Sequence, residues 1–283
     1  MTFNKHAEIT TNKIKNRNNM LKTLAGSNWG KEKETMVTTF KSIVRPILNY
    51  AAPIWTPQLS QTNWSKLQRC QNSSLRIATG CHLMSGIDHL HTETLVLPAK
   101  IHNKMLSEQY LAMCHLPNHP CYQIIQQEPP PRDIRHTVQS SYLCNIQNLL
   151  PQPVNSSLLK SSLLYIHTNT VTNCTASYKP NRVLGTHPPP ISLAEKQLPR
   201  ETRAKLAQLR SGFSKLLNSY LSRVDPVVRD ECPLCQESPH NTSHLFNCSA
   251  NPTNLTPVDL WNNPIKVAEF LNLPTSPEFG DDC

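Results

Sequence analysis

Four residues near the C-terminus have the types and spacing expected of metal ligands. They follow the pattern Cys-x2-Cys-x8-His-x3-Cys, formed by Cys232, Cys235, His244 and Cys248. Two thiols separated by two residues can point into one site from a tight turn, and residues four apart share one face of a helix. Zinc prefers four such ligands in a tetrahedron. We therefore predict a closed, structural Zn²⁺ site without a position for a catalytic water. His240 is a poorer fourth ligand, because its spacing to Cys248 does not suit one helical turn.

Other residues with reactive side chains give weaker signals. His89, His91 and Glu93 lack the spacing of a zinc-protease helix, in which two His four apart flank a Glu, so we expect structural hydrogen bonds there. The run Phe279-Gly280-Asp281-Asp282 resembles the polymerase hairpin that holds catalytic Mg²⁺. It lies among prolines at the end of the sequence without flanking strands, so we expect a polar tail. The other cysteines are expected to be buried or incidental thiols: Cys70, Cys81, Cys114, Cys121, Cys144, Cys174 and Cys283.

Charge is unevenly distributed along the chain, whose formal net charge is +9. Residues 1–50 carry nine Lys and Arg against three acidic residues, whereas residues 231–283 carry Lys266 alone against seven acidic residues. A basic body favours a polyanionic partner, most commonly RNA or DNA, although a solubilising surface is the alternative interpretation. The residues predicted to contact nucleic acid are Lys31, Lys33, Lys41, Arg45, Arg69, Arg203, Lys205, Arg210, Lys215 and Arg223.

Whether the protein resides in a reducing or an oxidising cellular compartment decides how its ten cysteines are interpreted. The first 20 residues are polar and rich in Asn and Lys, so they do not resemble a secretory signal. No apolar run is long enough to span a bilayer, and no membrane partner is expected. We predict an intracellular protein of the nucleus or cytoplasm with reduced thiols, in which clustered cysteines indicate metal rather than disulfides.

Hydrophobic periodicity predicts a mainly α protein with four helical segments. The first covers residues 31–49 and is kinked or ended by Pro46. The second starts near Thr62 as its N-cap and stops at Gly80. The third begins at Pro98, and the strongest, at 199–224, has an apolar stripe with basic residues mostly on its other faces.

Composition divides the chain into five predicted segments. The 24 prolines and seven glycines indicate packed parts separated by stiff connectors. A short helix around Ser156–Ile166 is possible within the linker at 117–198. The segments are a small helical bundle at 1–116, a Pro/Ser/Asn-rich, partly disordered linker at 117–198, a long basic amphipathic helix at 199–230, a small zinc module at 231–273 and a tail at 274–283.

Longer runs of residues resemble one known family, the jockey-like non-LTR (LINE-type) retrotransposon reverse transcriptases. The run 24–30 (LAGSNWG), followed by Lys33-Glu34-Thr35, is similar to the segment just after their polymerase palm. The runs 45–57 (RPILNYAAPIWTP), 67–72 (LQRCQN) and 75–81 (LRIATGC) resemble their thumb. The segment 232–248, with Leu260-Trp261 and 268–271 (AEFL), resembles their C-terminal zinc knuckle.

The resemblance implies a C-terminal piece of an RNA-directed DNA polymerase. Its thumb would grip the template–primer duplex and its knuckle would help hold element RNA or target DNA. The endonuclease, the fingers and the catalytic palm aspartates would lie upstream of Met1 in the full-length element, so this chain alone would have no catalytic residues and no small-molecule substrate. The eight-residue gap before His244 departs from the four-residue gap of viral nucleocapsid knuckles, so single-stranded RNA binding is not implied by that analogy. Two alternatives stay open: a stand-alone zinc-containing nucleic-acid-binding or adaptor protein, and a non-functional relic of a truncated element.

Overall fold

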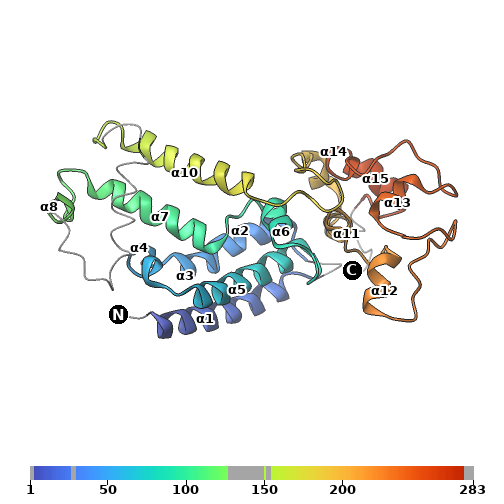
Figure 1. The fold of residues 1–283 in the computed structure, drawn as a ribbon, viewed down its shortest axis with the longest axis horizontal. Helices are drawn as coiled ribbons and strands as arrows, with labels where there is room; N and C mark the ends of the chain where they lie inside the picture. Colours follow the sequence, from blue (N-terminus) through green and yellow to red (C-terminus); the bar gives the residue numbers. More distant parts are fainter. Residues whose placement is uncertain (1–2, 27–29, 127–149, 151–153, 277–283) are drawn as a thin grey trace, which may run out of the picture. The chain divides into compact units, whose positions relative to one another are not determined.

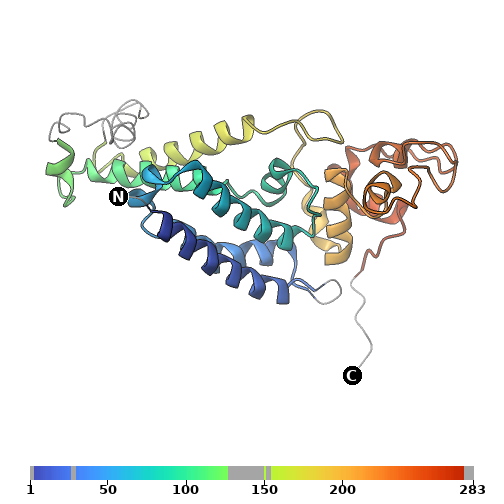
Figure 2. The same cartoon turned by 60° about the horizontal axis from the view of Figure 1, so that its bottom comes forward.

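The described part of the chain is helical. The structure is a computed structural model that describes residues 3–26, 30–126, 150 and 154–276. Within these residues there are helices and no β-strand (Figures 1 and 2), which confirms the mainly α prediction. The run Phe279–Asp282, part of the predicted linker, Cys144, Cys283 and residues 27–29 of the resemblance lie outside the described residues. The helices are α1 (Asn4–Thr23), α2 (Lys33–Ile43), α3 (Arg45–Asn49), α4 (Ala52–Trp55), η1 (Thr56–Gln58), α5 (Gln61–Thr79), α6 (Ile87–Thr94), α7 (Ala99–Cys114), α8 (Tyr122–Gln126), α10 (Leu159–Ala176), η3 (Leu193–Gln197), α11 (Arg200–Ser211), α12 (Asn218–Val224), α13 (Thr242–Asn247), α14 (Asp259–Asn262) and α15 (Pro264–Phe270).

The helices belong to two compact units, each assembled from three stretches of the chain. Unit 1 comprises residues 1–18, 41–71 and 96–178, and unit 2 comprises residues 19–40, 72–95 and 179–283. The range 1–116, predicted as one bundle, therefore contributes residues to both units. The region after residue 199 and the predicted zinc module belong to unit 2.

Unit 1 has a core between α7 and α10, which lie side by side in both views (Figures 1 and 2). Met105 and Ala112 of α7 are buried with Ile166 of α10. The helix α10 falls within the range predicted as linker and is longer than the short helix considered there. Its Ser-, Asn- and Thr-rich sequence has little helical periodicity of its own, so packing of Ile166 and Leu163 against α7 is what stabilises it.

The N-terminal helix α1 was not predicted from the sequence. Its buried apolar residues are Ala7, Ile14 and Leu21, spaced seven apart along one narrow stripe. Between them, the buried Asn18 donates from Nδ2 to the carbonyl oxygen of Cys70 at 3.1 Å. A stripe with one apolar residue every two turns is too sparse to stand out from a polar, Lys-rich segment.

Unit 2 is organised around α11. Leu206 and Leu209 of α11 share a buried core with Phe246, Leu260 and Trp261 from the predicted zinc module. This places the module and α11 in one hydrophobic core. The helices α14 and α15 of the module lie close to α11 (Figure 1).

The single helix predicted at 199–224 is two helices in the structure, α11 and α12. Gly212 has a φ of +73°, in the left-handed region that favours glycine, and ends α11. The amide of Gly212 donates to Leu209 O at 2.9 Å and that of Phe213 to Gln208 O at 3.1 Å, which satisfies the last carbonyls of α11. The amphipathic stripe continues through Gly212, and this hides the helix end from the periodicity.

Other predicted helix ends agree more closely with the structure. Gly80 has a φ of +74° and follows the last residue of α5, as predicted. Pro46 lies in the first turn of α3, after α2 has ended at Ile43. At the start of α5, Ser60 Oγ rather than the predicted Thr62 accepts the amide of Asn63, at 3.4 Å.

Candidate metal centre

A tight turn presents the first two cysteines of the predicted zinc site. The amide of Cys232 donates to Glu237 O at 2.8 Å, and the amide of Gln236 donates back to Cys232 O at 2.9 Å. Gln236 takes a φ of +63°, which reverses the chain directly after Cys235. The turn therefore holds both thiols on one side of the backbone.

The short helix α13 presents the other two ligands. The Asn241 side chain caps it by accepting the amide of His244 at 3.0 Å. Phe246 is buried in the core of unit 2 and fixes which way α13 faces. His244 lies within α13 and Cys248 directly follows its last residue, so both project from adjacent turns as the four-residue spacing predicted.

The four ligand atoms converge to the size of a zinc site. One ligand atom each from Cys232, Cys235, His244 and Cys248 lies within 4.8 Å of all the others. The Sγ atoms of Cys232 and Cys248 are 3.8 Å apart, and Cys235 Sγ lies 3.2 Å from His244 Nε2. Tetrahedral Zn–S bonds of about 2.3 Å place two sulfurs about 3.8 Å apart, so the thiol pair fits this ion. The structure thus shows a Cys₃His cluster that could hold a metal such as zinc.

The two cysteines of the turn differ in acidity. Desolvation raises the pKa of the Cys232 thiol, but the backbone amides of Cys235 and Leu234 outweigh it and lower this pKa to about 6. Desolvation and the neighbouring Cys232 raise the pKa of the Cys235 thiol to about 11. A bound dication would favour the thiolate form of both cysteines.

His240 has a supporting position beside the cluster. Its Nδ1 accepts the amide of Asn218 at 3.0 Å, and its own amide donates to Asp230 Oδ1 at 3.0 Å. Its ring lies 5.9 Å from that of His244, and it is not among the four converging ligands. His240 therefore ties the loop before α13 to α12, in keeping with its weaker rank as a ligand.

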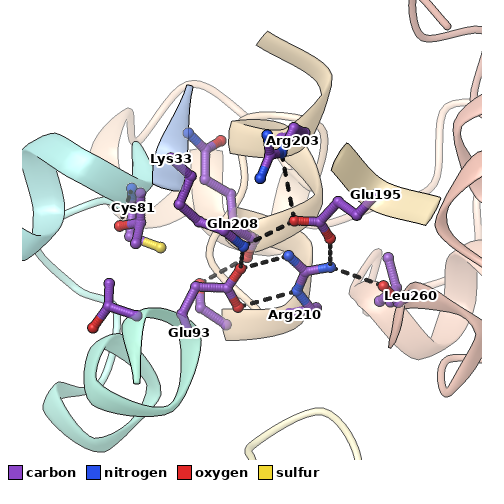
Figure 3. Close-up of polar contacts among 12 residues, drawn as sticks. Lys33, Cys81, Glu93, Glu195, Arg203, Gln208, Arg210 and Leu260 are labelled. Atoms are coloured by element: carbon purple, nitrogen blue, oxygen red, sulfur yellow. Dashed lines mark hydrogen bonds and ion pairs between the residues drawn. The ribbon is translucent and has the colours of Figure 1, made fainter. Parts of the chain in front are cut away.

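A buried ionic network lies in unit 2 and includes three of the residues predicted to contact nucleic acid (Figure 3). Arg210 is fully buried; its Nη2 lies 2.5 Å from Glu93 Oε1 and its Nη1 lies 2.6 Å from Glu195 Oε2. Lys33 bridges the same two carboxylates at 3.0 and 2.9 Å, and Arg203 Nη2 lies 2.5 Å from Glu34 Oε1. The expectation of solvated phosphate contacts at Lys33, Arg203 and Arg210 is therefore corrected, because their positive charges are neutralised inside the protein.

The electrostatics of this network are balanced. Burial raises the pKa of Glu93, but Arg210 and Lys33 outweigh it and hold that pKa far below the usual range. The same carboxylates, Glu93 and Glu195, raise the pKa of Lys33 against the opposing effect of its burial. Arg210 Nη1 also donates to Leu260 O at 2.8 Å, which connects the network to the start of the C-terminal helices (Figure 3).

His89 and Glu93 make structural polar contacts, as expected for this segment. A ring nitrogen of His89, Nε2, lies 3.0 Å from Ala207 O, and Glu93 belongs to the ionic network. His91 is buried in α6. The sequence contains the residues of this network, but the partner of Glu93 lies 117 residues away in Arg210, and no local pattern connects them.

The remaining predicted phosphate contacts divide by exposure. Lys205 pairs with Glu201 at 2.7 Å, and Arg45 is half-buried, with Nη2 3.5 Å from Leu97 O. Burial lowers the pKa of Arg45 to about 10. The exposed members of the set are Lys31, Lys41, Arg69, Lys215 and Arg223.

The structure adds an arginine that the sequence did not single out. The guanidinium of Arg182 lies 4.7 Å from the ring centre of Phe213, and that of Arg223 lies 5.7 Å from the same ring. Tyr220 contacts the Phe213 ring edge-on at 6.3 Å and stacks on His82 at 4.9 Å. We call His82, Phe213 and Tyr220 the ring cluster. Arg182 belongs to the predicted linker, so only the fold reveals its place here.

Comparison with protein-family models, curated proteins and solved structures finds no match to this chain. The resemblance to reverse transcriptases therefore stays a prediction. Across the described helices, none is both long and apolar enough to cross a membrane.

Proposed function

We propose that this chain binds nucleic acid through exposed basic residues around the ring cluster, beside a zinc-stabilised module. The observation that supports this most is the pair of exposed arginines, Arg182 and Arg223, held over the ring of Phe213. Contact with an aromatic ring positions a guanidinium without neutralising its charge. Both arginines therefore remain available to phosphate oxygens.

Lys215 extends this basic surface. It is exposed, and its charge acts with burial to lower the pKa of His82 in the ring cluster. Within the described part of the chain, no ion pair with a carboxylate engages Arg182, Lys215 or Arg223. Arg203 and Arg210, in contrast, form ion pairs with carboxylates inside the protein.

The zinc site has a structural role in this proposal. Residues 231–283 carry one basic residue against seven acidic ones, so this segment is not itself attractive to a polyanion. Phe246 and Trp261 nevertheless share a core with α11, which leads directly to Phe213. A metal held by four protein ligands would fix the module against the segment that carries the basic residues.

The resemblance to retrotransposon enzymes extends the proposal to a biological context. It supports a role as the thumb and knuckle part of a non-LTR retrotransposon reverse transcriptase, binding template–primer, element RNA or target DNA for a catalytic centre encoded upstream. The genomic sequence before Met1 tests this extension separately. An open frame containing palm aspartates would support it, and its absence would favour the stand-alone nucleic-acid-binding protein.

Salt-dependent binding tests the proposed surface. Zinc-loaded full-length chain is titrated against fluorescent single-stranded RNA and DNA, as wild type and as the triple variant Arg182→Gln, Lys215→Gln, Arg223→Gln. Each phosphate that the variant no longer neutralises reduces the slope of log K against log salt by about 0.7 for single strands, so the triple variant should show a slope smaller by about 2. Weakening should be similar for different sequences, because phosphate contacts carry no base information.

A charge-matched control separates this surface from general basicity. The triple variant Lys100→Gln, Lys160→Gln, Lys266→Gln removes the same charge at exposed positions outside the predicted contact set. Its slope should stay near that of the wild type. Equal reductions of the slope in both variants, or a flat salt response in the wild type, would contradict the proposal.

A further inference from the structure

A second group of soft metal ligands lies in unit 1. One ligand atom each from Cys114, His119 and Cys121 lies within 4.8 Å of the other two. Both cysteines were predicted to be buried or incidental thiols; Cys114 is buried as expected, and the structure places it together with Cys121 and His119. Their pattern, Cys-x4-His-x-Cys, is compact enough to have been a signal.

The backbone between the three residues is ordered into successive turns. Cys114 is the last residue of α7, and the amides of His115 and Leu116 donate back to Ala112 O at 3.2 Å and Met113 O at 3.0 Å. The amide of His119 donates to Leu116 O at 2.9 Å. Pro117 and Pro120 restrict the backbone of the same loop. These local hydrogen bonds turn the loop back toward the end of α7, where Cys121 lies close to Cys114.

The position of the cluster suits a cation. Cys114 is 1% exposed and stands at the C-terminal end of the 16-residue helix α7, where the helix dipole places partial negative charge. His119 and Cys121 are only half-buried, so an ion can reach the site. The hydroxyl of Tyr110 lies 3.7 Å from Cys121 Sγ, and its ring meets that of His119 edge-on at 5.7 Å.

The imidazole of His119 is already oriented by the loop. Its Nδ1 accepts the amide of Cys121 at 3.1 Å. Coordination through Nδ1 would replace this hydrogen bond, and coordination through Nε2 would require a proton on Nδ1 and would also break it. Either route exchanges one neutral hydrogen bond for a metal–nitrogen bond.

We propose that Cys114, His119 and Cys121 form a second site for a zinc-class ion, with water as its fourth ligand. Two thiols and an imidazole favour Zn²⁺, and the cluster has no carboxylate of the kind that Mg²⁺ or Ca²⁺ would need. Three protein ligands leave one coordination position open, in contrast to the closed Cys₃His site. The second ion is therefore the more weakly held and the more exchangeable of the two.

Metal stoichiometry of the full-length chain tests this inference. Protein purified with a phosphine reductant is loaded with Zn²⁺, washed and measured by elemental analysis, and its release to a chromogenic chelator is followed with time. The wild type should hold two ions per chain and release them in two phases, the faster from the second site. Cys121→Ser and His119→Gln should each hold one ion and lack the fast phase, whereas Cys232→Ser should hold one and lack the slow phase.

Two further variants control for unfolding and for other thiols. Cys121→His keeps a ligand at the partly exposed position and should retain two ions, and Cys174→Ser, at a thiol outside both clusters, should also retain two. Helical circular dichroism checks that the variants at Cys121, His119 and Cys174 keep the fold of the wild type; Cys232→Ser is expected to lose only the structure of the module at 231–273. A wild type with one ion that is absent from Cys232→Ser overturns the inference, and so does a second ion that survives both Cys121→Ser and His119→Gln. A disulfide between Cys114 and Cys121 that persists under reductant would also overturn it.

Discussion

At the scale of single residues, the Cys₃His cluster shows how far spacing alone can predict a site. The spacing of Cys232, Cys235, His244 and Cys248 identifies all four ligands, because a two-residue turn and a four-residue helical step are local geometries. The same approach misses Arg182, whose role depends on a ring more than 30 residues away in the sequence. The sequence pattern also predicts that Arg210 faces solvent. This is wrong because periodicity cannot show that Arg210 pairs with Glu93, which is far away in the sequence.

Loss of one zinc ligand should unfold the module at 231–273. Cys232→Ser removes a thiolate and should abolish binding at this site, and binding of a structural zinc is commonly coupled to about 10–16 kcal/mol of folding free energy near neutral pH. Trp261 is 1% exposed in the core shared with Phe246, so its fluorescence should shift toward that of a hydrated indole. Cys174→Ser should leave the emission unchanged. A Cys232→Ser protein with wild-type zinc content and emission would rule out this site.

Removing one carboxylate from the ionic network should be costly. Glu93→Gln leaves Arg210 and Lys33 buried with one fewer counter-charge, and breaking such a buried pair typically costs about 3–5 kcal/mol. Urea unfolding at pH 7 measures this change in stability. The matched change Glu201→Gln breaks the exposed pair with Lys205 and should cost less than about 1 kcal/mol. Equal effects of the two changes would show that the network contributes little.

The same carboxylate predicts a pH dependence. The pKa of Glu93 is lower in the folded protein than in the unfolded chain, so its stabilisation is complete above about pH 4.3, the usual value for glutamate. It is lost as the pH falls from there toward the folded pKa. The stability advantage of the wild type over Glu93→Gln should therefore shrink by up to about 1.4 kcal/mol per pH unit below pH 4. An advantage that stays constant between pH 5 and pH 3 would exclude this titration.

At the scale of helices, the sequence predicts an element well where a single residue ends it and poorly where packing decides. Gly80 and Pro46 interrupt helices through their own backbone properties, and both predictions agree with the structure. In contrast, α1 and α10 are polar helices whose sparse apolar residues become visible only once their neighbours are known. The break at Gly212 is equally local, but a continuous apolar stripe masks it.

Gly80 offers a test of how α5 ends against α11. Its φ of +74° disfavours any residue with a Cβ, and a Cβ there would lie 2.7 Å from the Cβ of Ala204. Gly80→Ala should therefore destabilise unit 2 by more than about 1 kcal/mol, measured by thermal or urea unfolding. Gly86→Ala is the control, since Gly86 has a φ of −57° and nothing lies within 4 Å of the added Cβ. This control should be neutral or slightly stabilising, and a larger destabilisation there than at Gly80 would contradict the geometry.

At the scale of the whole molecule, the chain's positive charge divides into an internal and an external part. Lys33, Arg203 and Arg210 face Glu34, Glu93 and Glu195 inside unit 2, so these three cations do not contribute to an external field. The net charge of +9 therefore comes from the other residues of the chain. A partner would meet those that the structure shows as exposed, such as Lys215 and Arg223. The units are also built from interleaved stretches, so composition along the chain could not show which segments fold together.

The purified full-length chain should not extend a primer. Two-metal phosphoryl transfer needs carboxylates that converge on Mg²⁺ from a rigid scaffold. In the described residues, the groups of three or more potential metal ligands consist of Cys and His and contain no carboxylate. Asp281 and Asp282 lie outside the described residues, and their position beside Pro277 does not match the strand–turn–strand context of a polymerase hairpin.

Incubation with RNA template, DNA primer, nucleotides and Mg²⁺ or Mn²⁺ should give no product, while an added active reverse transcriptase should extend the same primer. Extension by the pure chain that disappears in Asp281→Asn, Asp282→Asn would show instead that these carboxylates form a catalytic centre.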